Sequence, residues 1–184
     1  DRQLLERFAG LTRERGRICD MGCGPGEVAA FLVPLHPDII GIDASPEMFK
    51  QARVLVPGAT FMVDDMTALS LVDGALAGIA AFYAIVNFPP EALPGIFSGF
   101  HRVLRPGGLL LMAFHAGNER IHVDSFFECG EPLDFFYFDP DGVLEMLRQT
   151  GFAVREALVR HPYPEEYPSR RCYLFAEKES LCAG

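Results

Sequence analysis

The sequence has no long apolar run. Its 184 residues are 49% hydrophobic, yet no stretch of eighteen or more apolar residues occurs, and a membrane-spanning helix needs about twenty. The first residues, Asp1 to Arg7, also lack the basic and then apolar layout of a signal peptide. We therefore expect a soluble, cytoplasmic protein without a membrane partner, whose length suits one domain over residues 1–184.

The sequence has few cysteines, and their spacing forms no known motif. The five cysteines are odd in number and scattered, and none belongs to two C-x-x-C pairs or to a C-x-x-C pair followed by a pair of histidines. This spacing predicts neither a disulfide framework nor a zinc site, so we expect no metal.

Basic residues are in the minority. Lysine and arginine number 16 against 25 acidic residues, which gives a net charge of −9. A protein that neutralises backbone phosphates needs a basic face, so we expect no nucleic-acid partner. Arg170 and Arg171 are adjacent, but such a pair typically lies on a solvated surface.

Short apolar runs bounded by Gly, Pro or Asp alternate with amphipathic segments. Five of them have strand character: Arg17–Met21, Asp38–Asp43, Thr60–Val63, Ile79–Tyr83 and Leu109–His115. Strands that alternate with helices in this way predict a parallel sheet.

Helix starts and a final hairpin complete the expected fold. Ser45 and Asp139 are each followed by proline and then an acid, which is typical of a helix start. We expect helices over Pro90–Val103 and Pro140–Gln149, and an antiparallel hairpin of Gly151–Arg160 with Arg171–Glu177. The fold class is therefore α/β: a Rossmann-like, seven-stranded, mostly parallel sheet flanked by helices, with a C-terminal antiparallel hairpin.

One segment departs from this alternation. Residues 117–138 are long and aromatic, with the rings Phe126, Phe127, Phe135, Phe136, Tyr137 and Phe138. Long loops in compact domains are usually functional or disordered, and the aromatic content favours an ordered flap. We expect this inserted flap to form much of a pocket near the ends of the fourth and fifth strands.

A glycine-rich loop follows the first strand, at the edge where open α/β sheets bind ligands. Alternate glycines in Asp20-Met21-Gly22-Cys23-Gly24-Pro25-Gly26-Glu27 let the backbone turn tightly and approach a ligand. A dinucleotide fingerprint starting at Gly22 needs a third small residue where Glu27 stands, which disfavours NAD. The loop resembles motif I of the class I S-adenosylmethionine-dependent methyltransferases, D-x-G-C-G-x-G, at Asp20, Gly22, Cys23, Gly24 and Gly26.

The resemblance implies further contacts to S-adenosyl-L-methionine as cofactor. Asp43 ends the second strand, where an acid can accept both ribose hydroxyls, and Ala44 and Met48 match the segment that borders the adenine. After the third strand, Asp65 and the backbone nitrogen of Met66 match the adenine-amino contact. Asp64 is the alternative at that position, and Met48 could equally be a core residue.

The resemblance also implies the activity, methyl transfer to a small-molecule acceptor. His115 at the end of the fifth strand is a candidate general base, and Tyr83 at the end of the fourth is a candidate substrate contact. The letters of Asn87-Phe88-Pro89-Pro90 resemble an N-methyltransferase motif, but their order and distance from the strand differ, so that chemistry is not carried over. An NAD(P)-dependent oxidoreductase and a catalytically silent S-adenosylmethionine-binding subunit are the alternatives. The oligomeric state does not follow from the sequence.

Overall fold

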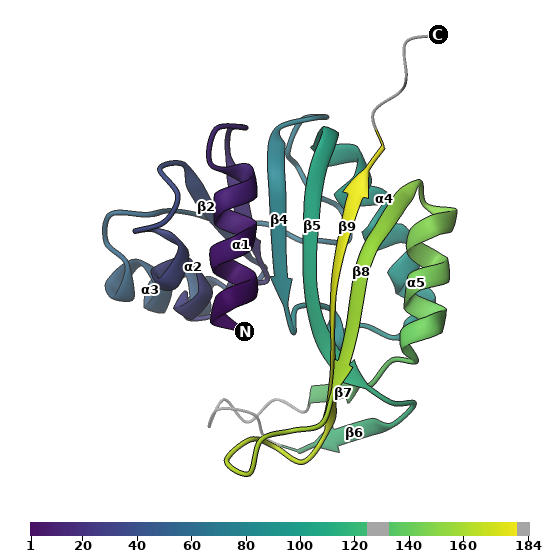
Figure 1. Cartoon of the computed structure of the whole chain (residues 1–184). Helices are drawn as coiled ribbons and strands as arrows, with labels where there is room; N and C mark the ends of the chain where they lie inside the picture. The colour runs from purple at the N-terminus through teal and green to yellow at the C-terminus, as the bar shows by residue number, and fades with distance from the viewer. Residues whose placement is uncertain (125–132, 180–184) are drawn as a thin grey trace, which may run out of the picture.

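A seven-stranded sheet forms the centre of the computed structural model, which describes residues 1–124 and 133–179. Its strand order is β3-β2-β1-β4-β5-β9-β8 (Figure 1). The strands are β1 (Ile18–Met21), β2 (Ile39–Asp43), β3 (Thr60–Val63), β4 (Leu76–Phe82), β5 (Leu104–Ala116), β8 (Phe152–Arg160) and β9 (Arg170–Lys178). The first five in the spatial order pair in parallel, and β9 is antiparallel to both β5 and β8. The predicted mostly parallel sheet with a C-terminal antiparallel hairpin is confirmed.

Helices cover both faces of the sheet. Figure 1 shows α1 (Arg2–Thr12) crossing in front of the sheet and α4 (Leu93–Val103) behind it. Helices α1 and α2 (Glu27–Leu32) pack one apolar cluster against the sheet, and α4 and α5 (Pro140–Gln149) pack a larger one on the other face. Gly78 of β4 lets α1 approach closely, since a Cβ there would lie 2.7 Å from the Phe8 ring. The central strands β1, β2, β4 and most of β5 are therefore buried on both faces, as a parallel sheet requires, whereas the outer strands β3 and β8 are more exposed.

The helix starts that the sequence predicts are formed. The Ser45 hydroxyl accepts a hydrogen bond from the Met48 amide at the start of α3 (Pro46–Leu55), and Asp139 accepts one from the Gly142 amide in α5. These side chains satisfy amides that have no partner within the first turn. Helix α5 and strand β3 have the predicted bounds.

Three predicted bounds need correction, and one helix was missed. The fourth strand is Leu76–Phe82 rather than Ile79–Tyr83. The helix predicted from Pro90 begins as a short 3-10 turn, η2 (Pro90–Ala92), before α4, and the fifth strand starts at Leu104 rather than Leu109. Helix α1 was not predicted, although its buried residues Leu5, Phe8, Ala9 and Thr12 recur at helical spacing.

Among the described residues no helix is long and apolar enough to cross a membrane.

The aromatic flap contains a second, two-stranded sheet. Strands β6 (Arg120–Val123) and β7 (Leu133–Phe136) pair antiparallel, and β7 contacts the 3-10 turn η1 (Ile85–Asn87) that follows β4. Figure 1 shows this hairpin at the foot of the sheet, at the carboxyl end of β4 and beside the β8–β9 connection. Phe126 and Phe127 lie outside the described residues.

Candidate active site

The three glycines of the first loop have different roles. Gly22, Gly24 and Gly26 all have positive φ, at 67°, 51° and 94°, a conformation that favours glycine. A Cβ at Gly22 would lie 2.7 Å from the Ala84 Cβ, and one at Gly26 would lie 3.1 Å from the Ala52 Cβ. A Cβ at Gly24 would meet no described atom within 4 Å. Gly22 and Gly26 therefore permit close packing, whereas Gly24 borders open space.

Asp43 fixes the glycine loop to the end of β2. Its Oδ2 accepts a hydrogen bond from the Gly24 amide at 2.8 Å, and its Oδ1 accepts one from the Ser45 amide at 2.9 Å. A carboxylate has about four acceptor positions, so both oxygens can still accept from ligand hydroxyls. Asp43 is thus already oriented by backbone donors on two sides.

Asp20 is a buried carboxyl group with an unused oxygen. It is 2% exposed, and its Oδ2 has no hydrogen-bond partner among the described residues. Burial raises the pKa of Asp20 to about 7, a hydrogen bond with the Ala29 backbone opposes this, and the Asp43 charge adds to it. Burial also raises the pKa of the neighbouring Cys23 thiol, which therefore stays protonated.

Two cavities meet at the glycine loop. The larger has a volume of about 390 Å³ and the smaller about 320 Å³, and both are bordered by Gly22, Gly24 and Tyr83. Asp20, Cys23 and Glu27 line the smaller cavity. The predicted residues that line the larger are Gly22, Gly24, Asp43, Ala44, Met48, Met66 and Tyr83, and Asp64, the alternative to Asp65, lines it too.

The end of β3 favours Asp64 over Asp65 as a wall of the larger cavity. Asp64 borders it, and its carboxylate also accepts from the amide and the hydroxyl of Ser70 at 2.9 and 3.0 Å. Asp65 is not among the described residues that line it, and its carboxylate accepts from the Thr67 amide at 2.8 Å. Gly26 is likewise outside both linings, at the start of α2.

Tyr83 has a left-handed backbone conformation, with φ 53°. Such a conformation is rare for a bulky residue and is often found at functional sites. Its amide donates to the Ala113 carbonyl of β5 at 2.8 Å, and its hydroxyl lies 3.4 Å from the Tyr173 hydroxyl. The ring is thereby held where the two cavities meet.

His115 lies beside Tyr83 at the end of β5. Their ring centroids are 4.9 Å apart, and the His115 Nδ1 lies 2.7 Å from the Ser169 hydroxyl oxygen. Burial, and then the nearby Arg171 charge, lower the pKa of His115 to about 4, so the imidazole is neutral at physiological pH. Sequence alone predicts His115 and Tyr83, and the structure brings them together.

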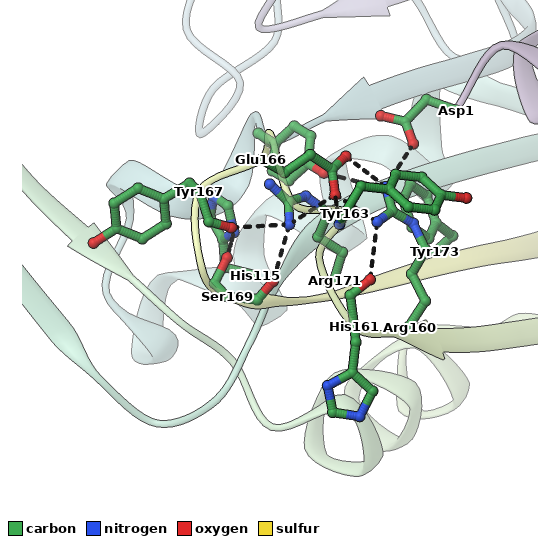
Figure 2. Close-up of polar contacts among 11 residues, drawn as sticks. Asp1, His115, Arg160, His161, Tyr163, Glu166, Tyr167, Ser169, Arg171 and Tyr173 are labelled. Atoms are coloured by element: carbon green, nitrogen blue, oxygen red, sulfur yellow. Dashed lines mark hydrogen bonds and ion pairs between the residues drawn. The ribbon is translucent and has the colours of Figure 1, made fainter.

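A network of charged side chains supports this end of the sheet (Figure 2). Glu166 accepts two hydrogen bonds from the Arg160 guanidinium, at 2.6 and 2.8 Å, and lies 3.3 Å from Arg171. Arg160 also donates to the Tyr173 hydroxyl at 2.9 Å. The expectation that both adjacent arginines are solvated is wrong for Arg171, which is 6% exposed because it pairs with Glu166 and donates to loop carbonyls.

Sequence reasoning missed Arg160, Glu166, Ser169 and Tyr173. The signal in the sequence was that they lie in or beside a Pro- and Glu-rich turn. The contacts of these residues depend on two features of the fold. The β5–β9 register places His115 opposite Arg171, and the β8–β9 loop, residues 161–169, folds back over the end of the sheet.

A third cavity, of about 350 Å³, adjoins His115 on the flap side. Its lining residues are His115, Ile121, Val123, Phe135, Tyr137 and Tyr167. They come from β5, from both flap strands, from Tyr137 directly after β7 and from the β8–β9 loop. We call this cavity the flap pocket.

Comparison with known proteins identifies the family. Residues 18–108 match the family model described as a methyltransferase domain. The chain is 32% identical over 167 residues to the putative methyltransferase YqeM of Bacillus subtilis, which covers 85% of this chain and 68% of that protein. It is 31% identical over 113 residues to the uncharacterized methyltransferase sll0829 of Synechocystis, covering 58% of this chain and 53% of that protein. The chain belongs to the S-adenosylmethionine-dependent methyltransferases, and it spans about half the length of several curated relatives that it matches.

Solved structures show the same fold. A SAM-dependent methyltransferase from Methanosarcina mazei superimposes with a TM-score of 0.79 at 19% identity, covering 89% of this chain and 92% of that one. S-adenosylmethionine is the cofactor of the family.

Proposed function

We propose that this chain catalyses methyl transfer from S-adenosylmethionine to a small-molecule acceptor at the carboxyl ends of β4 and β5. The observation that carries the proposal is the pair of cavities that share Gly22, Gly24 and Tyr83. They extend from the glycine loop to Tyr83, and the Tyr83 ring lies 4.9 Å from the ring of His115, which lines the flap pocket. Cofactor and acceptor would therefore meet beside Tyr83 and His115.

The residues present fit the cofactor. The buried, unpartnered Oδ2 of Asp20 can accept from an ammonium group, Asp43 can accept from ribose hydroxyls, and the open space at Gly24 admits a ligand close to the backbone. Ala44, Met48 and Met66 would border the adenine, with Asp64 or Asp65 as the acid beside it and Cys23 and Gly26 shaping the loop. When bound, S-adenosylmethionine supplies an electrophilic methyl group on a sulfonium, which needs little more than alignment with the acceptor.

His115 can take a proton from the acceptor. Its Nδ1 lies 2.7 Å from the Ser169 hydroxyl oxygen, and an Nδ1–H group can donate to that oxygen. This leaves the lone pair of His115 Nε2 available, and the neutral imidazole can act as a general base.

A matched pair of glycine variants tests the cofactor site. Gly24 and Gly74 both have positive φ, at 51° and 68°, so alanine strains the backbone at either position. Gly24 borders both cavities, whereas Gly74 lies in the turn before β4. By calorimetry, we expect Gly24→Ala to weaken binding of S-adenosylhomocysteine by about tenfold or more, because the added methyl group occupies ligand space.

The control variant, Gly74→Ala, should lose a similar amount of thermal stability and bind S-adenosylhomocysteine as the wild type does. Equal binding by the two variants would show that the cofactor does not lie against this loop.

A further inference from the structure

The flap pocket continues the cofactor cavity along β7. Leu133 and Phe135 are two residues apart and therefore lie on the same face of the strand. Leu133 lines the larger cavity near Tyr83, Asn87 and Phe88, whereas Phe135 lines the flap pocket. An acceptor in the flap pocket thus lies next to the cofactor site, with one strand as their common cover.

The hairpin presents an apolar face to this pocket. Ile121 pairs with Phe135, and Val123 pairs with Leu133, so all four side chains are on one face. The opposite face has Arg120 and His122, which both contact Asp134, at 2.7 and 2.9 Å, and are largely exposed. The charged face is satisfied in solvent, whereas Ile121, Val123 and Phe135 of the apolar face line the flap pocket.

The described side chains that line the flap pocket have no formal charge at neutral pH, because burial and Arg171 keep His115 neutral. Among the described residues the buried cation is Arg171, which already donates to the Tyr167 and Ser169 carbonyls at 3.2 and 2.9 Å and contacts Glu166. It is 6% exposed and is not part of the lining of the flap pocket. An ammonium would meet no carboxylate among the described lining residues, and an unpaired charge is costly to bury.

The walls of the pocket are flat. The His115 ring packs against two tyrosine rings, with Tyr83 at 4.9 Å and 36° and Tyr137 at 5.0 Å and 25°. Tyr167 meets His115 edge to face at 6.3 Å. Aromatic rings in offset-stacked and edge-to-face arrangements gain energy beyond apolar burial alone, which favours a planar ligand over a saturated chain.

We propose that the methyl acceptor is an uncharged compound with a planar ring, which binds in the flap pocket with its reactive edge toward Tyr83 and the cofactor cavity. This inference rests on the proposed function and specifies the class of its acceptor. Binding of the ring, not of a charged group, then supplies the affinity.

Three probes that share one planar two-ring skeleton and differ in charge provide the test. They are 2-naphthol, which is uncharged at neutral pH, the anion 2-naphthoate, and 2-naphthylmethylamine, which is a cation. Each is titrated calorimetrically into the full chain, with and without S-adenosylhomocysteine. We expect 2-naphthol to bind about tenfold or more tightly than either charged probe, because these must lose hydration without gaining a partner.

Variants from two separate elements place the binding in the flap pocket. Ile121→Asp adds a charge to the apolar face of β6, and Tyr167→Ala removes a ring from the β8–β9 loop. Both should weaken 2-naphthol binding by about tenfold or more and leave S-adenosylhomocysteine binding unchanged. Their matched controls, His122→Ala on the exposed face of β6 and Tyr163→Ala in the same loop, should bind both ligands normally.

The outcomes separate the two proposals. If S-adenosylhomocysteine binds but a charged probe has an affinity equal to or higher than that of 2-naphthol, the assignment of the acceptor class is wrong and the proposed function stands. The same conclusion follows if S-adenosylhomocysteine binds and Ile121→Asp has the same affinity for 2-naphthol as His122→Ala. If S-adenosylhomocysteine does not bind to the wild type, the proposed function itself is wrong.

Discussion

Burial acts on Asp20 and His115 in the same physical sense. In both it favours the uncharged form, which raises the pKa of the carboxyl group to about 7 and lowers that of the imidazole to about 4. For His115 this leaves a neutral imidazole at the wall of the flap pocket. For Asp20 it leaves a site that gains most when a positive group arrives to pair with the carboxylate.

Asp20→Asn tests the cost of that unpaired acid. The folded-state pKa of Asp20 is above the unfolded value of 3.8, so its contribution to stability is present below about pH 4 and is lost as pH rises through about 7. A shift of this size corresponds to on the order of 4 kcal/mol. Above neutral pH we expect Asp20→Asn to melt at a higher temperature than the wild type, with the difference shrinking toward pH 4.

The exposed Asp73→Asn variant is the control, since its carboxylate is 79% exposed and pairs with Arg102 at the surface. It should show no such pH-dependent gain. A wild type whose melting temperature does not fall between about pH 4 and 8 relative to Asp20→Asn would mean that Asp20 is paired in the folded protein.

At the scale of elements, the sequence predicts a helix, strand or loop where residues within that element determine its ends. This was the case for the helix caps Ser45 and Asp139, for the glycine loop and for the short apolar strands. Strands β6 and β7 were not predicted, because each has only four residues and is stabilised by pairing with the other, within a segment for which the sequence predicts no strand. The role of Arg171 depends on Glu166 and on the register with β5, neither of which follows from local sequence.

The Glu166 carboxylate is one of the groups that hold the β8–β9 loop. Glu166 accepts from Arg160 and from the Tyr163 amide and contacts Arg171, and Arg160 and then the Tyr163 amide lower the pKa of Glu166 to about 2. We expect Glu166→Gln to lower the melting temperature and weaken 2-naphthol binding, because Tyr167 loses its fixed position in the flap pocket. Glu165→Gln, an exposed neighbour, should change neither.

The pH dependence gives a second readout. A lowered folded-state pKa means that the stabilisation by Glu166 is present above about pH 4.5 and is lost as pH falls through about 2. The difference in melting temperature between the wild type and Glu166→Gln should therefore be constant above about pH 4.5 and decrease below it. A difference that instead grows in acid would show that the loop is not held by this ion pair.

At the scale of the whole molecule, the sheet brings every candidate residue to one edge. Strands β1, β2, β3, β4 and β5 end there with Asp20 or the glycine loop, Asp43, Asp64, Tyr83 and His115. This much was predictable, because parallel strands share a carboxyl edge. The choice of Asp64 over Asp65 as cavity wall and the separation into a cofactor side and a flap pocket were not, because both depend on where side chains point after the strands end.

The cofactor class is the central claim, and a calorimetric comparison of S-adenosylhomocysteine with NAD tests it most directly. Both ligands have ribose hydroxyls for Asp43, but Glu27 and Asp20 line the smaller cavity beside the glycine loop, where their carboxyl groups disfavour a pyrophosphate and can accept from an ammonium group. We predict that S-adenosylhomocysteine binds to the wild type about a hundredfold more tightly than NAD. Binding of NAD with equal or higher affinity would contradict the account.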